Sequence, residues 1–410
     1  MEFSKELLER AAACEELLRD RFAAIDAAAL ENTARVLDVF RANMLSERHF
    51  APSAGYGYND DGRELCDRAF AQIFGCEAGF ANIISGTHAL AIGLYGLLRP
   101  GDTLLSATGK PYDTLDEVIG LSGNPGDGSL KDLGVAFRSV ELVDGKTIDY
   151  AAVEQALQAG GVRIVFCQRS KGYQNRRTLT VAEIDRLYEL VRRFEGVYLY
   201  VDNCYGEFCE TREPKADLLA GSLIKNAGGG IAETGGYLVG SERAVELAAY
   251  RLSVPGMGAE AGATLGTTKP MLKGLFFAPH VVAQALKTAH FAAALFERSG
   301  YDCFPAALEP RSDIIQTLLL GSREKLLRFC KGIQSGSPVD SFVTPEGWAM
   351  PGYSDEVVMA AGAFTQGSSI ELSADAPIKP PYRVYMQGGL TYESGKLGVL
   401  AALQAMEAED

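Results

Sequence analysis

One lysine, Lys225, is followed closely by three consecutive glycines in the segment GSLIKNAGGGIAETGGYLVG, residues 221–240. Glycine lets a main chain approach a bound group closely, but it costs conformational entropy on folding. A cluster of glycines beside an amine therefore calls for a functional explanation. We expect this backbone to pass beside a bound group and to leave room for the lysine side chain to move.

An acidic residue, Asp202, lies near the end of the apolar run VYLYVDN, residues 197–203. The run is typical of a buried strand, and ligands of parallel sheets bind at the carboxyl ends of strands. A lysine amine forms a Schiff base with the aldehyde of pyridoxal 5'-phosphate, and an acid keeps the pyridine nitrogen protonated. Lys225 and Asp202 are the candidates for these roles. The alternative for Asp202 is a turn or helix cap in DNCYGEF.

A phosphate group needs N–H donors, and the segment ISGTHAL at residues 84–90 offers them. It has the pattern of a strand, a glycine turn and a helix start, so Gly86 and Thr87 place backbone N–H groups where the helix dipole also favours an anion. Ser222, three residues before Lys225, adds a candidate hydroxyl. A helix N-cap explains either segment equally well when it is taken alone.

Two further side chains suit a site for an amino acid bound to this cofactor. Tyr112 in KPYDTL could stack its ring on the pyridine, although tyrosines also pack half-buried in cores. Arg383 in PPYRVYMQGG is flanked by apolar residues at strand spacing. It either extends its charged end to solvent or binds a carboxylate through two hydrogen bonds.

The elements that would position these residues alternate along the chain. Short apolar runs such as GFANIIS, DTLLSAT and VRIVFCQ alternate with segments of helical period, which predicts an α/β fold with a mostly parallel sheet covered on both faces. The runs DIIQTLLLG, FVTPEG, VVMAAGAF, SIELSA and YRVYMQGG, which follow a long helix, indicate a small α+β domain with antiparallel strands. We predict an N-terminal helical segment at 1–49, a cofactor-binding large domain at 50–275 and a C-terminal small domain at 276–410.

Composition limits the classes of partner. The 410 residues carry a net charge of −14, so the chain lacks the basic field that attracts nucleic acid or an anionic membrane. The eight cysteines show no metal-ligand spacing and are expected to be reduced thiols, and no metal is predicted. The N-terminus lacks the layout of a signal peptide, and no apolar run reaches spanning length, so we expect a cytoplasmic protein.

Together these segments resemble a known family. GYGYNDDGRE, SGTHAL, VDNCYGEF, GSLIKNAGGGIAETGGY and QGSSIELSADAP with PPYRVYMQGGLTY are similar to blocks in the aluminium-resistance branch of the cystathionine gamma-synthase and methionine gamma-lyase family. The likeness runs from about residue 50 to near the C-terminus. It implies the fold type I of pyridoxal phosphate enzymes, which is also the fold of aspartate aminotransferase.

The resemblance also implies roles for individual residues. Lys225 holds the cofactor and then moves protons, and Asp202 contacts the ring nitrogen. The other implied contacts are Tyr112 on the ring face, Gly86, Thr87 and Ser222 on the phosphate, and Arg383 on the substrate α-carboxylate. Tyr56 matches a tyrosine that reaches the cofactor phosphate of a neighbouring subunit. This implies a homodimer or homotetramer with active sites at the subunit interface.

The chain departs from the family pattern where substrate is expected to bind. Tyr58 stands where the lyases carry an arginine, with Arg63 further on as a candidate replacement. The element after the middle strand reads CQRSKGYQNRR and places Gln168 and Ser170 at a strand end. We predict that Tyr58, Gln168 and Ser170 help to line the substrate pocket.

The function implied by the resemblance is β- or γ-elimination on a sulfur-containing amino acid, as in cystathionine beta-lyase and methionine gamma-lyase. Transamination and aldol cleavage stay open, because these reactions share one lysine-bound cofactor and differ in how the pocket orients the bond to be broken. A third alternative is a binding protein that keeps the fold without catalysis. The sequence leaves the physiological substrate open.

Overall fold

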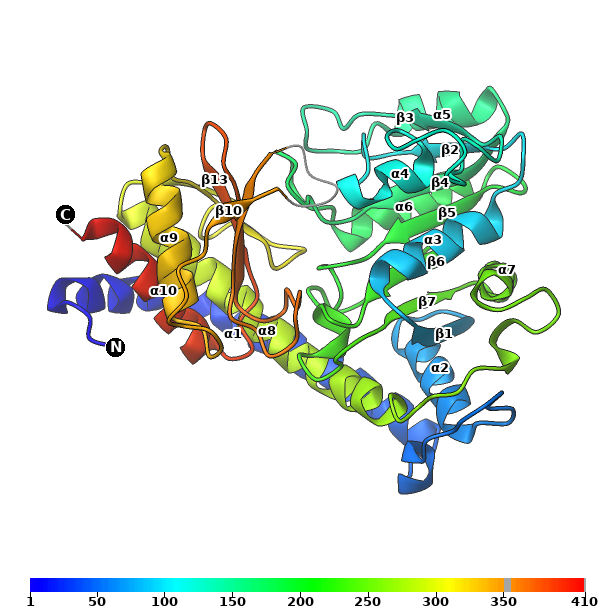
Figure 1. The fold of residues 1–410 in the computed structure, drawn as a ribbon, viewed down its shortest axis with the longest axis horizontal. Helices are drawn as coiled ribbons and strands as arrows, with labels where there is room; N and C mark the ends of the chain where they lie inside the picture. Colours follow the sequence, from blue (N-terminus) through cyan, green and yellow to red (C-terminus); the bar gives the residue numbers. More distant parts are fainter. Residues whose placement is uncertain (350–354, 409–410) are drawn as a thin grey trace.

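The computed structural model describes residues 1–349 and 355–408 and shows two lobes, each built on one β-sheet (Figure 1). The strand order of the first sheet is β1-β7-β6-β5-β4-β2-β3. Its strands are β1 (Ala78–Ile83), β2 (Thr103–Ser106), β3 (Ala136–Ser139), β4 (Val162–Gln168), β5 (Tyr198–Asp202), β6 (Leu218–Ser222) and β7 (Gly236–Gly240). Strand β7 is antiparallel to its neighbours β1 and β6, and all other pairs are parallel. The predicted mostly parallel sheet is confirmed.

Both faces of this sheet are covered because its strands are apolar on both sides. In β4, Ile164 and Phe166 belong to one buried cluster and Val165 and Cys167 to the other. One face packs on α3 (Gly86–Leu97) and α7 (Glu242–Leu252), and the other on α2 (Asp61–Ile73), α5 (Tyr150–Gln158) and α6 (Val181–Val191). The short helical turns are η1 (Glu47–Phe50), η2 (Asp113–Leu115), α4 (Asp116–Ile119), η3 (Asn226–Gly228) and η4 (Gly258–Glu260). With its faces closed, the sheet leaves the carboxyl ends of β4, β5 and β6 as the edge where a ligand can bind.

The second sheet is antiparallel throughout, with strand order β10-β11-β12-β13-β9-β8. Its strands are β8 (Asp302–Phe304), β9 (Gln316–Leu319), β10 (Gly347–Trp348), β11 (Val357–Ala361), β12 (Ser373–Pro377) and β13 (Arg383–Gln387). Helices α9 (Arg323–Ser335) and α10 (Tyr392–Glu407) share its buried core. The predicted α+β lobe is confirmed. The expected strand FVTPEG contributes only Gly347, since a proline cannot donate to a strand ladder.

Two long helices, α1 (Lys5–Ala42) and α8 (Thr268–Arg298), run side by side across both lobes (Figure 1). The N-terminal half of α1 buries Leu7 and Leu18 in the core of the second sheet, whereas Val36 lies in the core of the first. Helix α8 likewise contributes Leu275 to the first core and Phe296 to the second. The predicted domain boundary between residues 275 and 276 falls inside α8, and the division into three segments stays a prediction.

The glycines after Lys225 face α8, which differs from the contact predicted for them. A Cβ on Gly228 would lie 1.6 Å from the carbonyl oxygen of Leu223, and a Cβ on Gly274 would lie 2.3 Å from the carbonyl oxygen of Gly228. Gly229, with φ +56°, would meet the carbonyl oxygen of Gly274 at 2.4 Å. The absence of side chains at these glycines therefore lets the loop that contains Lys225 and the glycines after it, the lysine loop, pack directly on α8. This packing fixes the position of the loop.

Three further observations concern membrane-spanning helices, cysteine thiols and metal-binding groups. None of the helices described has the combination of length and apolar character that a bilayer crossing requires. All eight cysteines are free thiols. Within residues 1–349 and 355–408, no group of three or more His, Cys, Asp or Glu side chains could hold a metal ion.

The contact between the lysine loop and α8 predicts that one glycine-to-alanine substitution in the helix lowers the stability of the chain. Replacing glycine by alanine inside a helix normally stabilises a protein by about 0.5–1 kcal/mol. We expect Gly274→Ala instead to destabilise this chain by about 1–3 kcal/mol, because the new methyl group overlaps the Gly228 carbonyl. Urea unfolding gives the comparison, with Lys273→Ala as the exposed neighbour that stays close to the parent. A Gly274→Ala midpoint at or above the parent value would contradict the contact.

Candidate active site

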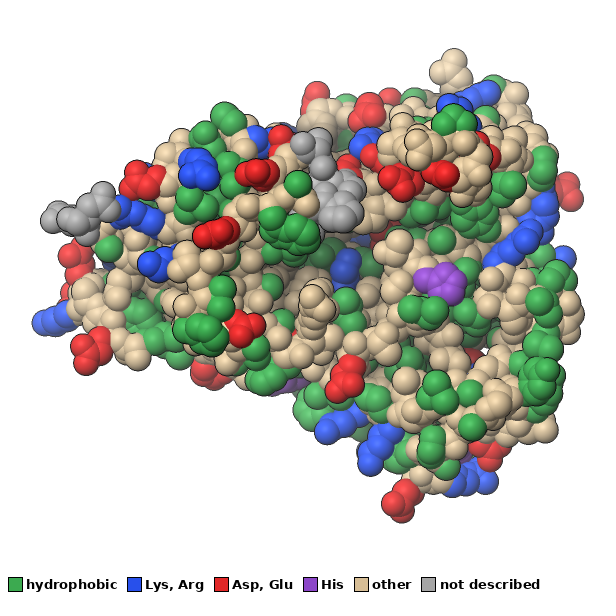
Figure 2. Space-filling model, in the orientation of Figure 1, with side chains coloured by type: hydrophobic (Ala, Val, Ile, Leu, Met, Phe, Trp, Pro, Cys, Tyr) green, Lys and Arg blue, Asp and Glu red, His purple; other side chains and the backbone are tan. Residues whose placement is uncertain are grey.

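A cavity of about 270 Å³ lies between the lobes at the carboxyl edge of the first sheet, where the surface is hollowed (Figure 2). Lys225, which follows β6, and Asp202, the last residue of β5, both line it. Their side chains share this cavity without forming an ion pair within the described part of the chain. The acid and the amine predicted to act together are therefore brought together, with space between them.

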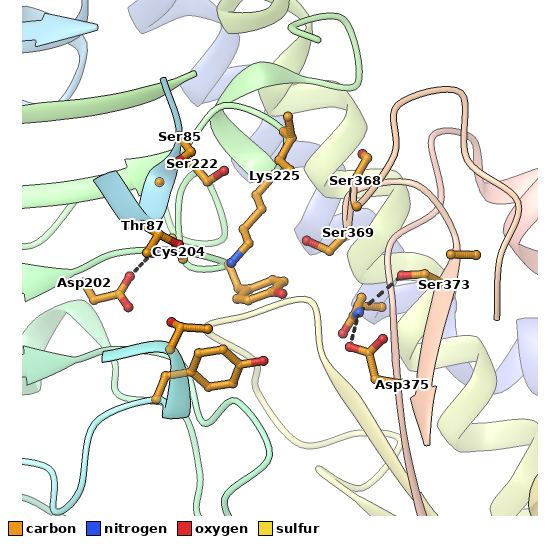
Figure 3. Close-up of a pocket in the computed structure, with 18 of the residues that line it drawn as sticks. Ser85, Thr87, Asp202, Cys204, Ser222, Lys225, Ser368, Ser369, Ser373 and Asp375 are labelled. Atoms are coloured by element: carbon orange, nitrogen blue, oxygen red, sulfur yellow. Dashed lines mark hydrogen bonds between the residues drawn. The ribbon is translucent and has the colours of Figure 1, made fainter. Parts of the chain in front are cut away.

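Asp202 is fixed by the turn that follows it. The backbone N–H of Cys204 donates to Asp202 Oδ1 at 3.1 Å (Figure 3). Burial raises the pKa of the Asp202 carboxyl, while the Lys225 ammonium and the hydrogen bonds from Cys204 act in the opposite direction. A protonated ring nitrogen beside this carboxylate would favour its ionised form in the same way as Lys225 does.

Lys225 lies over an aromatic ring. Its Nζ is 4.2 Å from the centroid of Tyr205, a distance at which an ammonium is attracted to the ring face. Tyr205 has φ +71°, which is strained for a bulky residue and is most often found at functional sites. Burial by itself lowers the pKa of the Lys225 ammonium, but the acidic groups around it, Asp202 among them, raise that pKa above its usual range.

The start of α3 forms an anion cradle on the same cavity. Ser85 caps the helix, with its Oγ accepting from the N–H of His88 at 3.2 Å, and Gly86 and Thr87 follow as its first residues. A Cβ on Gly86 would lie 2.6 Å from Cβ of Ser222. Glycine therefore lets the helix N-terminus come against the end of β6, so that helical N–H groups and the Ser222 hydroxyl converge, as the labelled side chains show (Figure 3).

Tyr112 forms another wall of the cavity, and the predicted pocket residue Gln168 positions it. Gln168 Oε1 accepts from the backbone N–H of Tyr112 at 2.7 Å, and its Nε2 donates to the carbonyl oxygen of Ser170 at 2.9 Å. Gln168 and Ser170 line a smaller recess that continues from the cavity beside Lys225. The Ser170 hydroxyl donates to Asp313 at 2.9 Å. Both predicted residues reach the recess, with their polar atoms bonded to the protein.

Three predicted residues line neither the cavity nor the recess. Tyr56 and Tyr58 are 69% and 55% exposed and stack on each other, with ring centroids 5.4 Å apart. Arg383 begins β13, whose last residue, Gln387, is the one that lines the cavity. Arg63, the candidate replacement for the missing arginine, is buried and donates to the carbonyl oxygens of Gly57, Gly262 and Glu260. It fixes two loops within its own chain.

The wall opposite the first sheet comes from the second lobe, and the sequence did not reveal it. Polar side chains of this wall are Ser368, Ser369, Ser373, Asp375 and Gln387. They are far along the chain from Lys225, in the blocks QGSSIELSADAP and PPYRVYMQGGLTY, which the family resemblance includes but to which no site role was assigned. Tyr173, Cys204 and Tyr205 were also missed as site residues. Cys204 and Tyr205 lie two and three residues after Asp202, and this proximity in the sequence was the signal available.

The donor set fits pyridoxal phosphate: an anion cradle, an acid and an amine open onto one cavity. A family model described as methionine gamma-lyase matches residues 6–407. The chain belongs to the methionine gamma-lyase family. Members of this family are pyridoxal phosphate-dependent enzymes that cleave carbon–sulfur bonds, so the protein is a lyase that uses this cofactor.

The chain is similar to individual relatives over most of its length. A Bacillus subtilis protein, YnbB, is 49% identical over 381 residues, which is 92% of this chain and 90% of the relative. A crystal structure from Clostridium novyi, named a carbon-sulfur lyase involved in aluminum resistance, is 44% identical with TM-score 0.94 over 98% of this chain and 96% of that chain. The pyridoxal-5'-phosphate dependent protein YhfS of Escherichia coli, at 15% identity and TM-score 0.62 over 92% and 95% of the two chains, shares the fold.

A buried amine outside the cavity, Lys171, is the alternative candidate for attachment of the cofactor. Lys171 is buried, and burial lowers the pKa of its ammonium to about 8, a change often found for reactive lysines. Its Nζ donates to the carbonyl oxygen of Phe304 at 2.9 Å. It is absent from the described lining of the cavity and the recess. Position favours Lys225, although the lowered pKa by itself would favour Lys171.

A buried polar network lies directly behind the lysine loop of the lyase. The Tyr237 hydroxyl donates to Glu207 Oε1 at 2.9 Å, and Asn226 Nδ2 donates to the carbonyl oxygen of Glu207 at 3.0 Å. Glu207 Oε2 is buried without a hydrogen-bond partner. Burial raises the pKa of Glu207 to about 8, so this acid is mostly neutral at pH 7.

This raised pKa predicts a pH-dependent effect of Glu207→Gln on stability. Between the usual glutamate pKa of 4.5 and about 8, the folded chain keeps a proton that the unfolded chain releases, so rising pH destabilises the parent through Glu207. We expect the free energy of unfolding of Glu207→Gln, relative to the parent, to rise by up to about 1.4 kcal/mol per pH unit across this window. Urea unfolding at several pH values measures it.

The exposed Glu2→Gln is the matched control for the loss of one acidic side chain. A difference from the parent that stays flat with pH for Glu207→Gln would show that Glu207 ionises in the folded chain as an ordinary glutamate does.

Proposed function

We propose that this lyase releases a thiol from a sulfur-containing amino acid by β- or γ-elimination at the cavity between the lobes. The observation that carries the proposal is that Lys225 and Asp202 enter this cavity without neutralising each other in an ion pair. Space between a half-buried amine and a buried acid suits a flat ring that contacts both. The Clostridium novyi structure, named a carbon-sulfur lyase, supports the same reaction class.

Five residues of the chain would hold the cofactor in addition to Lys225. The N–H groups of Gly86 and Thr87 and the hydroxyl of Ser222 bind its phosphate, and the ring of Tyr112 covers one face. Asp202 stabilises a protonated ring nitrogen, and the Cys204 N–H keeps the carboxylate oriented toward it. When bound, the cofactor supplies an electron sink for the charge left on the substrate α-carbon.

Lys225 moves the protons of the reaction. Its amine removes the substrate α-proton. In β-elimination the electron pair left behind forms the α,β double bond as the bond between the β-carbon and sulfur breaks, whereas γ-elimination also requires removal of a β-proton before the bond between the γ-carbon and sulfur breaks. The proton on the Lys225 ammonium is then available to the departing thiolate. The released enamine reacts with water to give an oxo acid and ammonia, so the net products are thiol, oxo acid and ammonia.

Neutral donors would bind the substrate α-carboxylate. Among the described residues that line the cavity, no arginine occurs, and Arg383 lies at the other end of the strand that contributes Gln387. Ser369 Oγ is buried there and makes no hydrogen bond of standard geometry to the protein. Hydroxyl groups such as that of Ser369 can donate to a carboxylate oxygen.

The reaction and the attachment point are tested together. We expect the purified holoprotein to release an oxo acid and a thiol or sulfide from one or more of cysteine, homocysteine, methionine and cystathionine. Pyruvate indicates β-elimination and 2-oxobutanoate γ-elimination. Lys225→Ala should lose the visible absorbance of lysine-bound cofactor, and its release rate should fall by about 100- to 10,000-fold.

Lys171→Met is the matched control, because it removes the buried amine outside the cavity. It should keep the visible absorbance, and the opposite pattern in the two variants would move the attachment point to Lys171. Keto-acid exchange without thiol release would instead indicate an aminotransferase.

The active site is proposed to lie at the interface of a homodimer, or of a homotetramer built from such dimers. Tyr56 and Tyr58 lie outside their own chain's cavity and are exposed, as expected for side chains that enter a neighbouring subunit. Exposed Leu265 lies on the segment that packs against this loop, since its N–H donates to the carbonyl oxygen of Ser53 at 3.2 Å. We also propose a cytoplasmic location, which eight free cysteines favour.

Mixed dimers test the shared site. Tyr56→Ala and Lys225→Ala should each lower activity when alone. When the two variants are co-refolded, random pairing should restore about a quarter of the parent activity, because half of the dimers contain one intact site. The control mixes Lys225→Ala with a chain that carries both substitutions, which leaves no intact site. No recovery in the first mixture would show that Tyr56 does not act across the interface.

A further inference from the structure

One charged side chain of the active-site cavity has no role in holding the cofactor. Lys225, Asp202 and Asp375 are the three charged residues that line it in the described part of the chain. The first two have been assigned to the cofactor. Asp375 lies in the middle of β12, in the second lobe. Figure 3 shows it across the cavity from Asp202, with Lys225 between them.

Asp375 is firmly oriented. Gln387 Nε2 donates to Asp375 Oδ2 at 3.1 Å and to Ser373 Oγ at 3.2 Å, which links neighbouring strands of the sheet (Figure 3). Tyr173 also hydrogen-bonds the carboxyl group, and its ring stacks on Tyr385 with centroids 4.8 Å apart. The carboxylate is therefore presented to the cavity in one orientation before any substrate arrives.

The surroundings of Asp375 favour a cationic ligand. The side chain is 7% exposed, and its hydrogen-bond partners Gln387 and Tyr173 are both neutral. A buried carboxylate with neutral donors alone bears most of its desolvation cost, and a cation placed beside it offsets that cost. Burial raises the pKa of Asp375 and the charge of Lys225 lowers it, so a second cation would further favour the ionised form.

The position of Asp375 selects the part of the substrate that it can reach. The α-amino group has to lie at Lys225, on the side of the first sheet, for the proposed reaction to occur. Asp375 lies on the opposite wall of the cavity, in the second lobe, and we place the part of the substrate beyond the sulfur on that side. A carboxylate at this point repels an acidic leaving group and attracts a basic one.

We propose that Asp375 is a specificity-determining residue that binds an ammonium group carried beyond the sulfur atom, so that the enzyme prefers cationic thioether amino acids. This inference rests on the proposed elimination function and adds the charge of the leaving group. The preferred leaving thiol carries an amine. Thiols with an uncharged alkyl end are released less efficiently.

Two nearly isosteric substrates test the inference. S-(2-aminoethyl)-L-cysteine and S-propyl-L-cysteine differ in having an ammonium or a methyl group at the end of the chain; the homocysteine analogues replace them if the enzyme proves to release 2-oxobutanoate. The parent holoenzyme should favour the ammonium substrate in kcat/KM for oxo-acid release by about 10- to 100-fold. The substrate concentration that gives half of the change in cofactor absorbance on mixing should be lower for the ammonium substrate than for the methyl one.

Asp375→Asn keeps the shape and removes the charge. We expect it to abolish most of the preference, lowering the ratio of the two kcat/KM values by about 10- to 100-fold. A ratio is unaffected by a general loss of active protein. Asp20→Asn, on the exposed surface of α1, is the matched control and should keep the parent ratio.

The outcomes separate this inference from the proposed function. Equal kcat/KM values for the two substrates in the parent enzyme, or an unchanged ratio in Asp375→Asn, would overturn the role of Asp375 while leaving the elimination reaction intact. Release of oxo acid from other sulfur amino acids but from neither member of the pair would also overturn it. Failure to release oxo acid from any sulfur amino acid would overturn the elimination function itself.

Discussion

The constraint on which this structure depends is the enclosure of an amine and a carboxylate in one cavity without an ion pair between them. Lys225 and Asp202 line this cavity, and burial taken alone disfavours the charged form of both groups. The two residues are held in position by the turn and the loop that carry them. The turn after β5 orients the carboxylate through Cys204, and the loop after β6 packs on α8 through bare glycine backbone. A ring that contacts both groups then replaces the missing pair.

The same constraint accounts for the arrangement of the first lobe. A parallel sheet covered on both faces leaves its carboxyl edge as the place where side chains can meet a ligand. Strand β5 ends at the acid, Asp202, and strand β6 ends shortly before the amine, Lys225. The start of α3 supplies N–H groups for an anion. Gly86 allows that helix to approach Ser222, so the anion cradle and the amine share one cavity. Small residues here fix distances between reactive groups.

The second lobe decides what the cavity accepts. Its antiparallel sheet places Asp375 and Gln387 opposite the cofactor residues, and α1 and α8 carry both lobes on one pair of long helices. The lobe adds no cationic side chain to the described lining of the cavity. The second lobe therefore presents one acid and several neutral donors to the substrate, and we assign the selectivity for substrate charge to this lobe. The residues assigned to the reaction belong to the first lobe.

The sequence by itself determined the cofactor chemistry, because the residues that carry it sit at the ends of strands and the starts of helices. Lys225, Asp202, Gly86, Thr87 and Ser222 all belong to such local patterns, which strand and helix periods make readable. The tertiary structure alone decided the rest. Residues from distant segments, such as Asp375, reach the cavity through packing that no local period encodes, and Arg383 is absent from the described lining, to which the opposite end of its strand contributes Gln387. The glycines after Lys225 show the same limit, since their partner, α8, is known only once the chain has folded.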